Sequence, residues 1–294
     1  MELNFETVTT PPRPAATVVL LRDGDEGLEV FLLQRHGLSD VLGGAYVFPG
    51  GKVDLADAEL DMAARLDQPL PALHTALGEP DIDALTAAGL YVAALREVFE
   101  ESGVLFAQAA AGEQAIDTAR AAALLRDGHA FDEMLGGMAL RLQTRSLLPW
   151  SRWITPRVPS VTNKRFDTRF FVAAMPPGQA ARHDDRETTG SAWLHPRAAL
   201  EQYRDRVIEL APPQIMSLAH LSRHTTVDSV LDAARERLPP VILPEPFEHE
   251  GGRMICYPGD ERHSVRERAL PGPTRLLYRD RRFEPADGFE ALFA

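Results

Sequence analysis

Three glutamates crowd one face of a helix that the sequence predicts over residues 84–102. Glu97, Glu100 and Glu101 stand at positions i, i+3 and i+4, where helical side chains are neighbours. Like charges at this spacing cost an isolated helix about 0.2–0.5 kcal/mol per pair, so the trio favours a role as oxygen ligands for a hard cation. Mg²⁺ is the cation that this chemistry indicates, with Mn²⁺ as its substitute. A solvated acidic face is the alternative for the helix taken alone.

The helix itself is predicted from its apolar residues and its end. Apolar side chains recur at helical spacing from Val92 to Phe99, and Gly103 follows as a residue suited to the left-handed turn that ends a helix. Arg96 lies four residues before Glu100, which is a favourable distance for an ion pair. Arg96 therefore either orients the Glu100 carboxylate or lies on the surface.

A Pro-Gly-Gly turn precedes this helix in the chain. An apolar strand over residues 46–48 runs into Pro49, Gly50 and Gly51. Glycine lets main-chain carbonyl and N–H groups approach a metal ion or a phosphate with no Cβ in the way. Gly50 and Gly51 are thus candidates for metal binding through the main chain, and a tight turn after a strand is the alternative.

The turn and the helix together resemble the Nudix box, G-x5-E-x7-R-E-U-x-E-E-x-G-U with U aliphatic, the signature of the Nudix hydrolases. Gly51 matches the first glycine of the box, and the run from Arg96 to Val104 matches its second half. Asp57 stands where the family usually has Glu. In addition, 38 residues (58–95) separate Asp57 from Arg96, where the family motif has seven. We assign Asp57 no role from the sequence.

A long insertion at this point is typical of one branch of the Nudix hydrolases. The chain also resembles that branch in its V-F-P-G-G-K-V-D start and in the later runs W-I-T-P and F-D-T-R-F-F. The branch includes the peroxisomal coenzyme A diphosphatase of animals and its bacterial relatives. The resemblance implies an α/β Nudix fold, an α/β/α sandwich with a mixed β-sheet, with a helical insertion within the box and a C-terminal extension.

The resemblance also implies an activity and the residues that perform it. The activity is the Mg²⁺-dependent or Mn²⁺-dependent hydrolysis of a diphosphate linkage in a nucleoside diphosphate derivative, giving two monophosphates. The implied catalytic residues are Arg96, Glu97, Glu100 and Glu101, and the implied metal ligands are these three glutamates with Gly50 and Gly51. Many Nudix enzymes add an acid from a later loop, and Glu187 in the charged run 182–187 is our first choice for that catalytic role. An exposed charged loop is the alternative.

Three basic residues are candidates for substrate binding. Arg35 corresponds to an arginine in the motif that accompanies the box in coenzyme A-cleaving Nudix proteins, although residues 38–42 lack the second basic residue of that motif. Lys164 and Arg165 stand at the start of a predicted strand, and both residue types commonly bind phosphate. Ion pairs with acids on the surface are the alternative for these two.

Three functions are consistent with these residues and with the family resemblance. The first is hydrolysis of coenzyme A or acyl-coenzyme A, which the branch resemblance favours. The second is the same chemistry on ADP-ribose, NADH or another nucleotide. The third is a non-catalytic Nudix module that senses a nucleotide, which the intact set of three glutamates disfavours.

Composition and charge limit the other classes of protein to which the chain could belong. The 294-residue chain has a net charge of −12, which disfavours nucleic-acid binding because the global field opposes phosphate contacts. No apolar run approaches the ~20 residues of a membrane span, and Cys256 is the single cysteine, expected to be a packed strand residue. We expect a cytoplasmic enzyme that acts on a small molecule and that is able to form a homodimer.

The rest of the pattern predicts one elaborated domain. Residues 1–238 are expected to form the Nudix domain, with the insertion at about 58–90, and residues 239–294 to form a C-terminal extension packed on it. Strands are predicted at 16–21 and 28–34, which form a hairpin, and at 46–48, 150–154, 165–174, 192–194, 254–257 and 275–278. Helices are predicted at 114–126, 131–144, 196–200, 212–221 and 226–238. This order of strands and helices is typical of a mixed sheet between helices.

Overall fold

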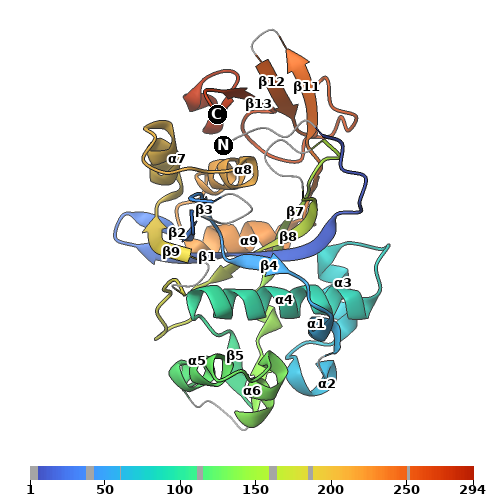
Figure 1. Cartoon of the computed structure of the whole chain (residues 1–294), viewed down its shortest axis with the longest axis vertical. Helices are drawn as coiled ribbons and strands as arrows, with labels where there is room; N and C mark the ends of the chain where they lie inside the picture. The colour runs from blue at the N-terminus through green and yellow to red at the C-terminus, as the bar shows by residue number, and fades with distance from the viewer. Residues whose placement is uncertain are drawn as a thin grey trace.

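The predicted hairpin forms the centre of a mixed β-sheet (Figure 1). The computed structural model describes residues 6–37, 43–59, 61–110, 115–158, 164–184, 188–249 and 252–294. Strand β1 (Arg13–Gly24) turns into β2 (Gly27–Arg35) with Gly24 opposite Gly27. Both strands are longer than predicted, because polar residues at their ends continue the pairing.

Within the described residues the sheet has eight strands, in the order β10-β7-β8-β1-β2-β3, with β4 beside β1 and β9 beside β2. β1 runs parallel to β8 and antiparallel to β2 and β4, so the sheet is mixed as predicted. The strands that join the hairpin are β3 (Tyr46–Val47), β4 (Gly50–Lys52), β7 (Leu148–Ile154), β8 (Phe166–Ala174), β9 (Thr188–Leu194) and β10 (Val241–Ile242).

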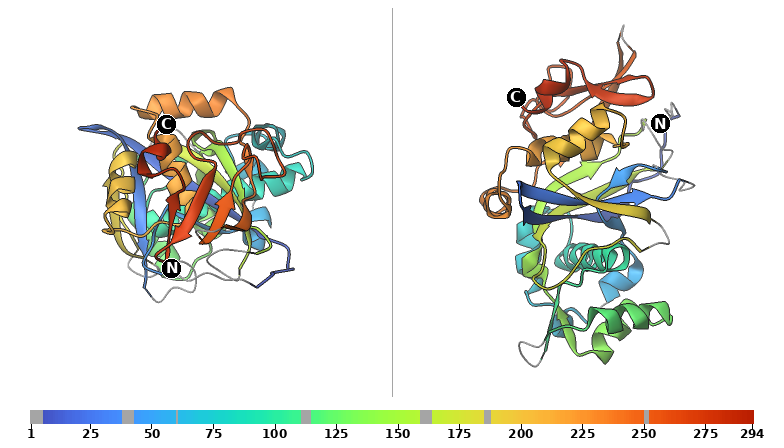
Figure 2. Two further views of the ribbon diagram at one scale, coloured as in Figure 1. Left: turned by 90° about the horizontal axis from the view of Figure 1, so that it is seen from above. Right: turned by 90° about the vertical axis from the view of Figure 1, so that its left-hand side faces the viewer.

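Helices cover both faces of this sheet, as the two views in Figure 2 show. Helix α4 (Ala84–Ser102) packs on one face, where Val18 and Phe171 of the sheet belong to its apolar core. The opposite face forms a second apolar core with three later helices, which are α7 (Pro196–Arg204), α8 (Pro212–Leu221) and α9 (Val227–Glu236). The predicted α/β/α sandwich is confirmed.

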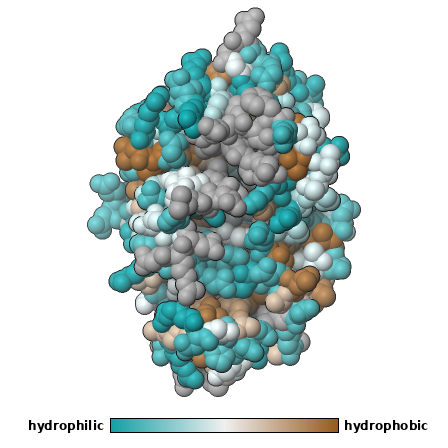
Figure 3. Space-filling model, viewed as in Figure 1, coloured by the Kyte–Doolittle hydropathy of each residue, from teal (hydrophilic) through white to brown (hydrophobic). Residues whose placement is uncertain are grey.

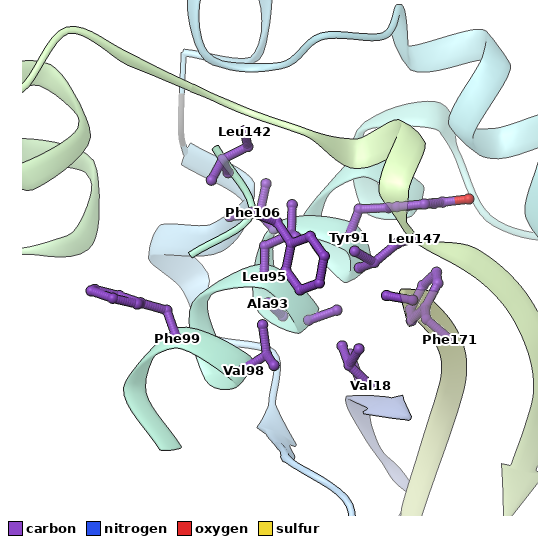
Figure 4. Packing of buried hydrophobic residues seen from close by; sticks show 14 of the residues in the cluster. Val18, Tyr91, Ala93, Leu95, Val98, Phe99, Phe106, Leu142, Leu147 and Phe171 are labelled. Atoms are coloured by element: carbon purple, nitrogen blue, oxygen red, sulfur yellow. The ribbon is translucent and has the colours of Figure 1, made fainter. Parts of the chain in front are cut away.

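Helix α4 is buried on its outer side as well. Residues from the insertion and from the segment after α4 form an outer cap over it, consisting of α1 (Leu55–Glu59), α2 (Met62–Arg65), α3 (Leu70–Leu77), β5 (Ala107–Ala109), α5 (Thr118–Arg126), α6 (Phe131–Gly137), β6 (Leu140–Leu142) and the short 3₁₀ helix η1 (Thr144–Ser146). A bridge between Leu66 and Leu142 joins the two parts of this cap. Figure 4 shows the result: Leu95 and Tyr91 of α4 belong to one apolar cluster with Phe106 and Leu142 of the cap region and Phe171 of the sheet.

One predicted helix of this cap is wrong in its second half. The pattern predicts a helix over 131–144, but α6 ends at Gly137 and the chain continues as β6. Two consecutive glycines, Gly136 and Gly137, weaken the helix, and Ala139 takes a left-handed φ of 50° that turns the chain into β6.

The C-terminal residues form a separate antiparallel sheet that packs against α7 and α8. Its elements are β11 (Glu245–His249), β12 (Gly252–Cys256), β13 (Arg275–Arg279) and β14 (Arg282–Pro285), followed by the 3₁₀ helix η2 (Phe289–Leu292). The Tyr203 hydroxyl donates a hydrogen bond to the Phe283 carbonyl at 2.9 Å, which ties α7 to β14. Cys256 is buried in β12, as predicted. The division of the chain at residue 238 stays a prediction.

The surface is predominantly hydrophilic on the face in Figure 3, among the side chains drawn in colour. Across the described ranges, no helix has both the length and the apolar character needed to cross a membrane.

A buried cluster of four charges fastens the outer cap to the sheet. Glu79, between α3 and α4, accepts two hydrogen bonds from the Arg169 guanidinium of β8, at 2.9 and 2.5 Å. Arg152 of β7 lies 2.9 Å from the same carboxylate and makes a two-bond pair with Asp167. Glu79 and Arg169 are only 7% and 5% exposed, so each depends on the other for compensation of its charge.

We expect Glu79→Ala to destabilise the fold by about 3–5 kcal/mol, because it leaves the buried Arg169 guanidinium without its main partner. Urea denaturation of the variant and the wild type would measure the change in the free energy of unfolding. Glu236→Ala is the matched control, because Glu236 is an exposed acid at the end of α9. A change below about 1 kcal/mol for Glu79→Ala, the range of surface pairs, would contradict the inference that this cluster fastens the cap.

Candidate functional site

Arg96 lies at the centre of a network that joins α4 to the segment after the glycine turn. Its Nε and Nη2 atoms donate to the two Asp57 oxygens at 2.8 and 2.9 Å. Its Nη1 donates to Glu97 at 2.9 Å and to Glu100 at 3.0 Å, and Nη2 also donates to the Lys52 carbonyl at 3.0 Å. Arg96 as a whole is 8% exposed, so the alternative of a surface position is wrong. Arg96 holds the two glutamates in fixed directions.

Asp57 is the residue that sequence reasoning left without a role. It is 3% exposed, and besides its two-bond pair with Arg96 it accepts a hydrogen bond from the Asp54 N–H at 2.8 Å. The insertion does not separate Asp57 from α4, because α1, the helix that contains Asp57, packs directly on α4. The signal that could have identified Asp57 is its distance from Gly51, which is the distance that the box prescribes for its first acid.

The glycine turn meets the helix at two points. The Gly50 N–H donates to Glu101 Oε2 at 2.8 Å. A Cβ on Gly51 would lie 2.5 Å from the Glu97 carboxyl group, and a Cβ on Gly50 would lie 2.4 Å from the Ala16 carbonyl oxygen of β1. At Gly50 the contact is with main-chain atoms, so only glycine allows β4 to lie this close to β1, whereas at Gly51 it is with the end of the Glu97 side chain. The structure brings together Gly50, Gly51, Arg96, Glu97, Glu100 and Glu101.

Burial sets the electrostatics of this cluster. Burial raises the pKa of Glu97 to about 7, although the neighbouring Arg96 opposes the shift. Burial also raises the pKa of Glu100, again against the effect of Arg96. For Arg96, burial disfavours the charge, but hydrogen bonds to Asp57 and the nearby carboxylates outweigh it and raise the pKa of the guanidinium. The site thus concentrates anionic groups that are poorly solvated, which is an environment that favours a bound cation.

The donor set fits Mg²⁺ or Mn²⁺, since all its members are carboxylate or carbonyl oxygens. The close approach of Gly51 to the Glu97 carboxyl group also fits, because it leaves the main chain accessible beside the acid. Among the described residues, no three acids, histidines or cysteines converge as a preformed metal cage. The reason is visible in the hydrogen bonds, because Glu97 and Glu100 are turned toward Arg96 and Glu101 toward Gly50.

Arg35 and Glu187 are two further residues that the sequence predicts for the site. Arg35 ends β2, opposite Thr188 of β9, and the loop before β9 reaches the end of α4 through a hydrogen bond from the Arg182 N–H to the Ser102 carbonyl at 2.9 Å. Glu187, the predicted loop acid, lies outside the described residues.

Lys164 and Arg165 lie at the start of β8, next to the start of β1. The Arg165 guanidinium donates to the Thr155 and Thr10 carbonyls at 3.0 and 3.1 Å, so part of its hydrogen-bonding capacity holds the main chain. By the strand order, β1 separates this position from β4.

Comparison with known proteins adds a family match. The family model described as the NUDT19 Nudix domain matches residues 9–221. The chain is similar to the acyl-coenzyme A diphosphatase NUDT19 of Xenopus laevis, with 26% identity over 273 residues that cover 79% of this chain and 70% of the relative. The human protein of the same name is 27% identical over 297 residues, which cover 87% of this chain and 76% of the relative.

A solved structure is also similar. A Nudix hydrolase from Alicyclobacillus acidocaldarius superposes with a TM-score of 0.61 at 28% identity, covering 79% of this chain and 98% of that structure. The predicted Nudix fold is confirmed by this similarity.

Proposed function

Because this chain belongs to the NUDT19 Nudix domain family, and is therefore a Nudix hydrolase, we propose that it hydrolyses the diphosphate linkage of coenzyme A or acyl-coenzyme A. The products are two monophosphates, and the cofactor is Mg²⁺ or Mn²⁺. The names of the NUDT19 relatives support the substrate class. The observation that carries the chemistry is the Arg96 network, which holds Glu97 and Glu100 beside the glycine turn despite the long insertion.

The glutamates are the metal-binding residues of this proposal. Glu97, Glu100 and Glu101 hold the cation, together with the Gly50 or Gly51 carbonyl. When bound, the cation neutralises diphosphate oxygens and lowers the pKa of the attacking water. Arg96 fixes the directions of Glu97 and Glu100, and Asp57 in turn fixes Arg96 through two hydrogen bonds.

The reaction needs one proton acceptor. The water oxygen forms a bond to one phosphorus atom, the bridging P–O bond breaks, and the proton of the water passes to a carboxylate. One of the α4 glutamates or the loop acid Glu187 accepts that proton. Arg35, Lys164 and Arg165 are the proposed contacts to the substrate outside the diphosphate.

Incubation of the purified protein with Mg²⁺ and a substrate panel tests this function. The panel holds coenzyme A, an acyl-coenzyme A, ADP-ribose, NADH and nucleoside triphosphates, and mass spectrometry identifies the products. We expect adenosine 3′,5′-diphosphate from coenzyme A, with no product in EDTA. Cleavage of another member only would move the substrate to that nucleotide, and no cleavage with either Mg²⁺ or Mn²⁺ would favour a non-catalytic module.

A further inference from the structure

Asp54 is a carboxylate at the edge of the Arg96 network, and it has no role in the proposed reaction. Its Oδ2 lies 3.5 Å from Arg96 Nη2. The main chain of Asp54 is fixed, because its N–H donates to Asp57 Oδ2 at 2.8 Å and its carbonyl accepts the Asp57 N–H at 3.1 Å. The Asp54 side chain is 67% exposed, whereas that of Asp57 is 3% exposed. The backbone thus holds a solvent-accessible carboxylate beside Arg96.

Arg96 has no N–H group left for Asp54. A guanidinium has five N–H donors. Three of them bond to Asp57 and to the Lys52 carbonyl, and the other two bond to glutamates of α4. Within the described part of the chain, the Asp54 carboxylate accepts no hydrogen bond from any other group either. Its oxygens are therefore available to a ligand.

The charges around Arg96 do not balance. One guanidinium contacts four carboxylates, which are those of Asp54, Asp57, Glu97 and Glu100. Burial raises the pKa of Glu100, and the charge of Asp54 contributes to the rise. An excess of negative charge on clustered oxygens favours a bound divalent cation.

Asp54 and Glu100 are the exposed carboxylates of this network. Glu100 Oε2 lies 3.0 Å from Arg96 Nη1, so the two acids contact the two terminal nitrogens of one planar group. The Glu100 side chain is 40% exposed. The octahedral geometry of Mg²⁺ places neighbouring ligand oxygens about 3 Å apart. Because both side chains reach solvent, their rotamers are free to make that approach when a cation binds between them.

We infer that Asp54 is a further ligand of the divalent cation, which it shares with Glu100 on the exposed side of the Arg96 network. This inference deepens the proposed function and rests on it, because the cation is the one that the proposed hydrolysis requires. Carboxylate oxygens are ligands that suit Mg²⁺ and Mn²⁺. Asp57 has a different role, since its two oxygens are bonded to Arg96 and it fixes the direction of that side chain.

Mn²⁺ binding to the protein alone tests this role without turnover. Electron paramagnetic resonance measures free Mn²⁺ during a titration of the wild type and of Asp54→Asn. We expect Asp54→Asn to bind Mn²⁺ on the order of tenfold more weakly, because the site loses an anionic ligand. Glu59→Gln is the matched control, because Glu59 is an exposed acid at the far end of α1, the helix that Asp54 precedes. It should bind Mn²⁺ as the wild type does.

Urea denaturation in EDTA checks that the fold is intact. Asp54→Asn removes no hydrogen bond made by the carboxylate within the described ranges, so the free energy of unfolding should change little. Unchanged Mn²⁺ affinity in Asp54→Asn would overturn the inference. An equal loss of affinity in Asp54→Asn and Glu59→Gln would also overturn it, because Asp54 would then act only as a distant charge.

Turnover of coenzyme A by the same samples separates this inference from the proposed function. Cleavage by a wild type whose Mn²⁺ affinity does not depend on Asp54 would overturn the role of Asp54 and leave the diphosphatase intact. Mn²⁺ binding that depends on Asp54, without cleavage of any panel substrate, would overturn the proposed hydrolysis and keep Asp54 as a cation ligand. If both hold, the Mg²⁺ concentration for half-maximal activity should rise in Asp54→Asn by about the factor measured for Mn²⁺ binding.

Discussion

Glu101→Gln and Glu100→Gln are each expected to lower turnover on the order of 10³-fold while the fold stays intact. A neutral amide removes one anionic oxygen from the cation site, and a bound cation contributes several kcal/mol of transition-state stabilisation. The Gln side chain still offers an oxygen that can accept the Gly50 N–H in place of Glu101, and the Arg96 N–H in place of Glu100. The loss therefore appears in kcat and in the Mg²⁺ concentration needed for half-maximal activity.

Glu133→Gln provides the matched comparison, because it makes the same chemical change at an exposed acid of α6. Initial rates across a Mg²⁺ titration, together with circular dichroism and thermal unfolding, separate loss of the site from loss of the fold. A Glu100→Gln or Glu101→Gln enzyme with near-normal kcat at low Mg²⁺ would remove these residues from the proposed metal site.

Local signals in the sequence were sufficient to predict α4. Its predicted bounds of 84–102 agree with the structure, because both ends are set by neighbouring residues. Asp83 accepts the Thr86 N–H at the start, and Gly103 takes a φ of 71° at the end, with its N–H bonded to the Phe99 carbonyl. The three glutamates then share a face through helical geometry alone.

The partner of Arg96 could not be predicted in the same way. Local spacing indicates Glu100, four residues away, but the stronger two-bond pair is with Asp57, 39 positions away. That contact depends on how the insertion packs on α4, and no local sequence pattern specifies this packing. Short edge strands such as β10 were missed because two residues carry too little pattern.

Glu97→Gln is expected to stabilise the metal-free protein while it abolishes turnover. The folded-state pKa of Glu97 is about 7, above the ordinary value of 4.5, because burial disfavours the carboxylate. A raised carboxyl pKa means that the folded state binds the proton more tightly than the unfolded state does. Ionisation of Glu97 thus destabilises the fold, with no cost below about pH 4.5, a growing cost up to about pH 7 and the full cost above it.

The neutral Gln removes that cost, so at pH 8 in EDTA we expect the variant to be more stable than the wild type on the order of 2–3 kcal/mol. At pH 4.5 the two proteins should have nearly equal free energies of unfolding, because Glu97 is then protonated in the folded state and still half protonated in the unfolded state. Urea denaturation at the two pH values, with Glu133→Gln as the control, measures this difference. A Glu97→Gln protein that is less stable than the wild type at pH 8 would mean that the pair with Arg96 outweighs burial. The expected combination of higher stability and lost activity would identify Glu97 as an acid kept for the cation at a cost to the fold.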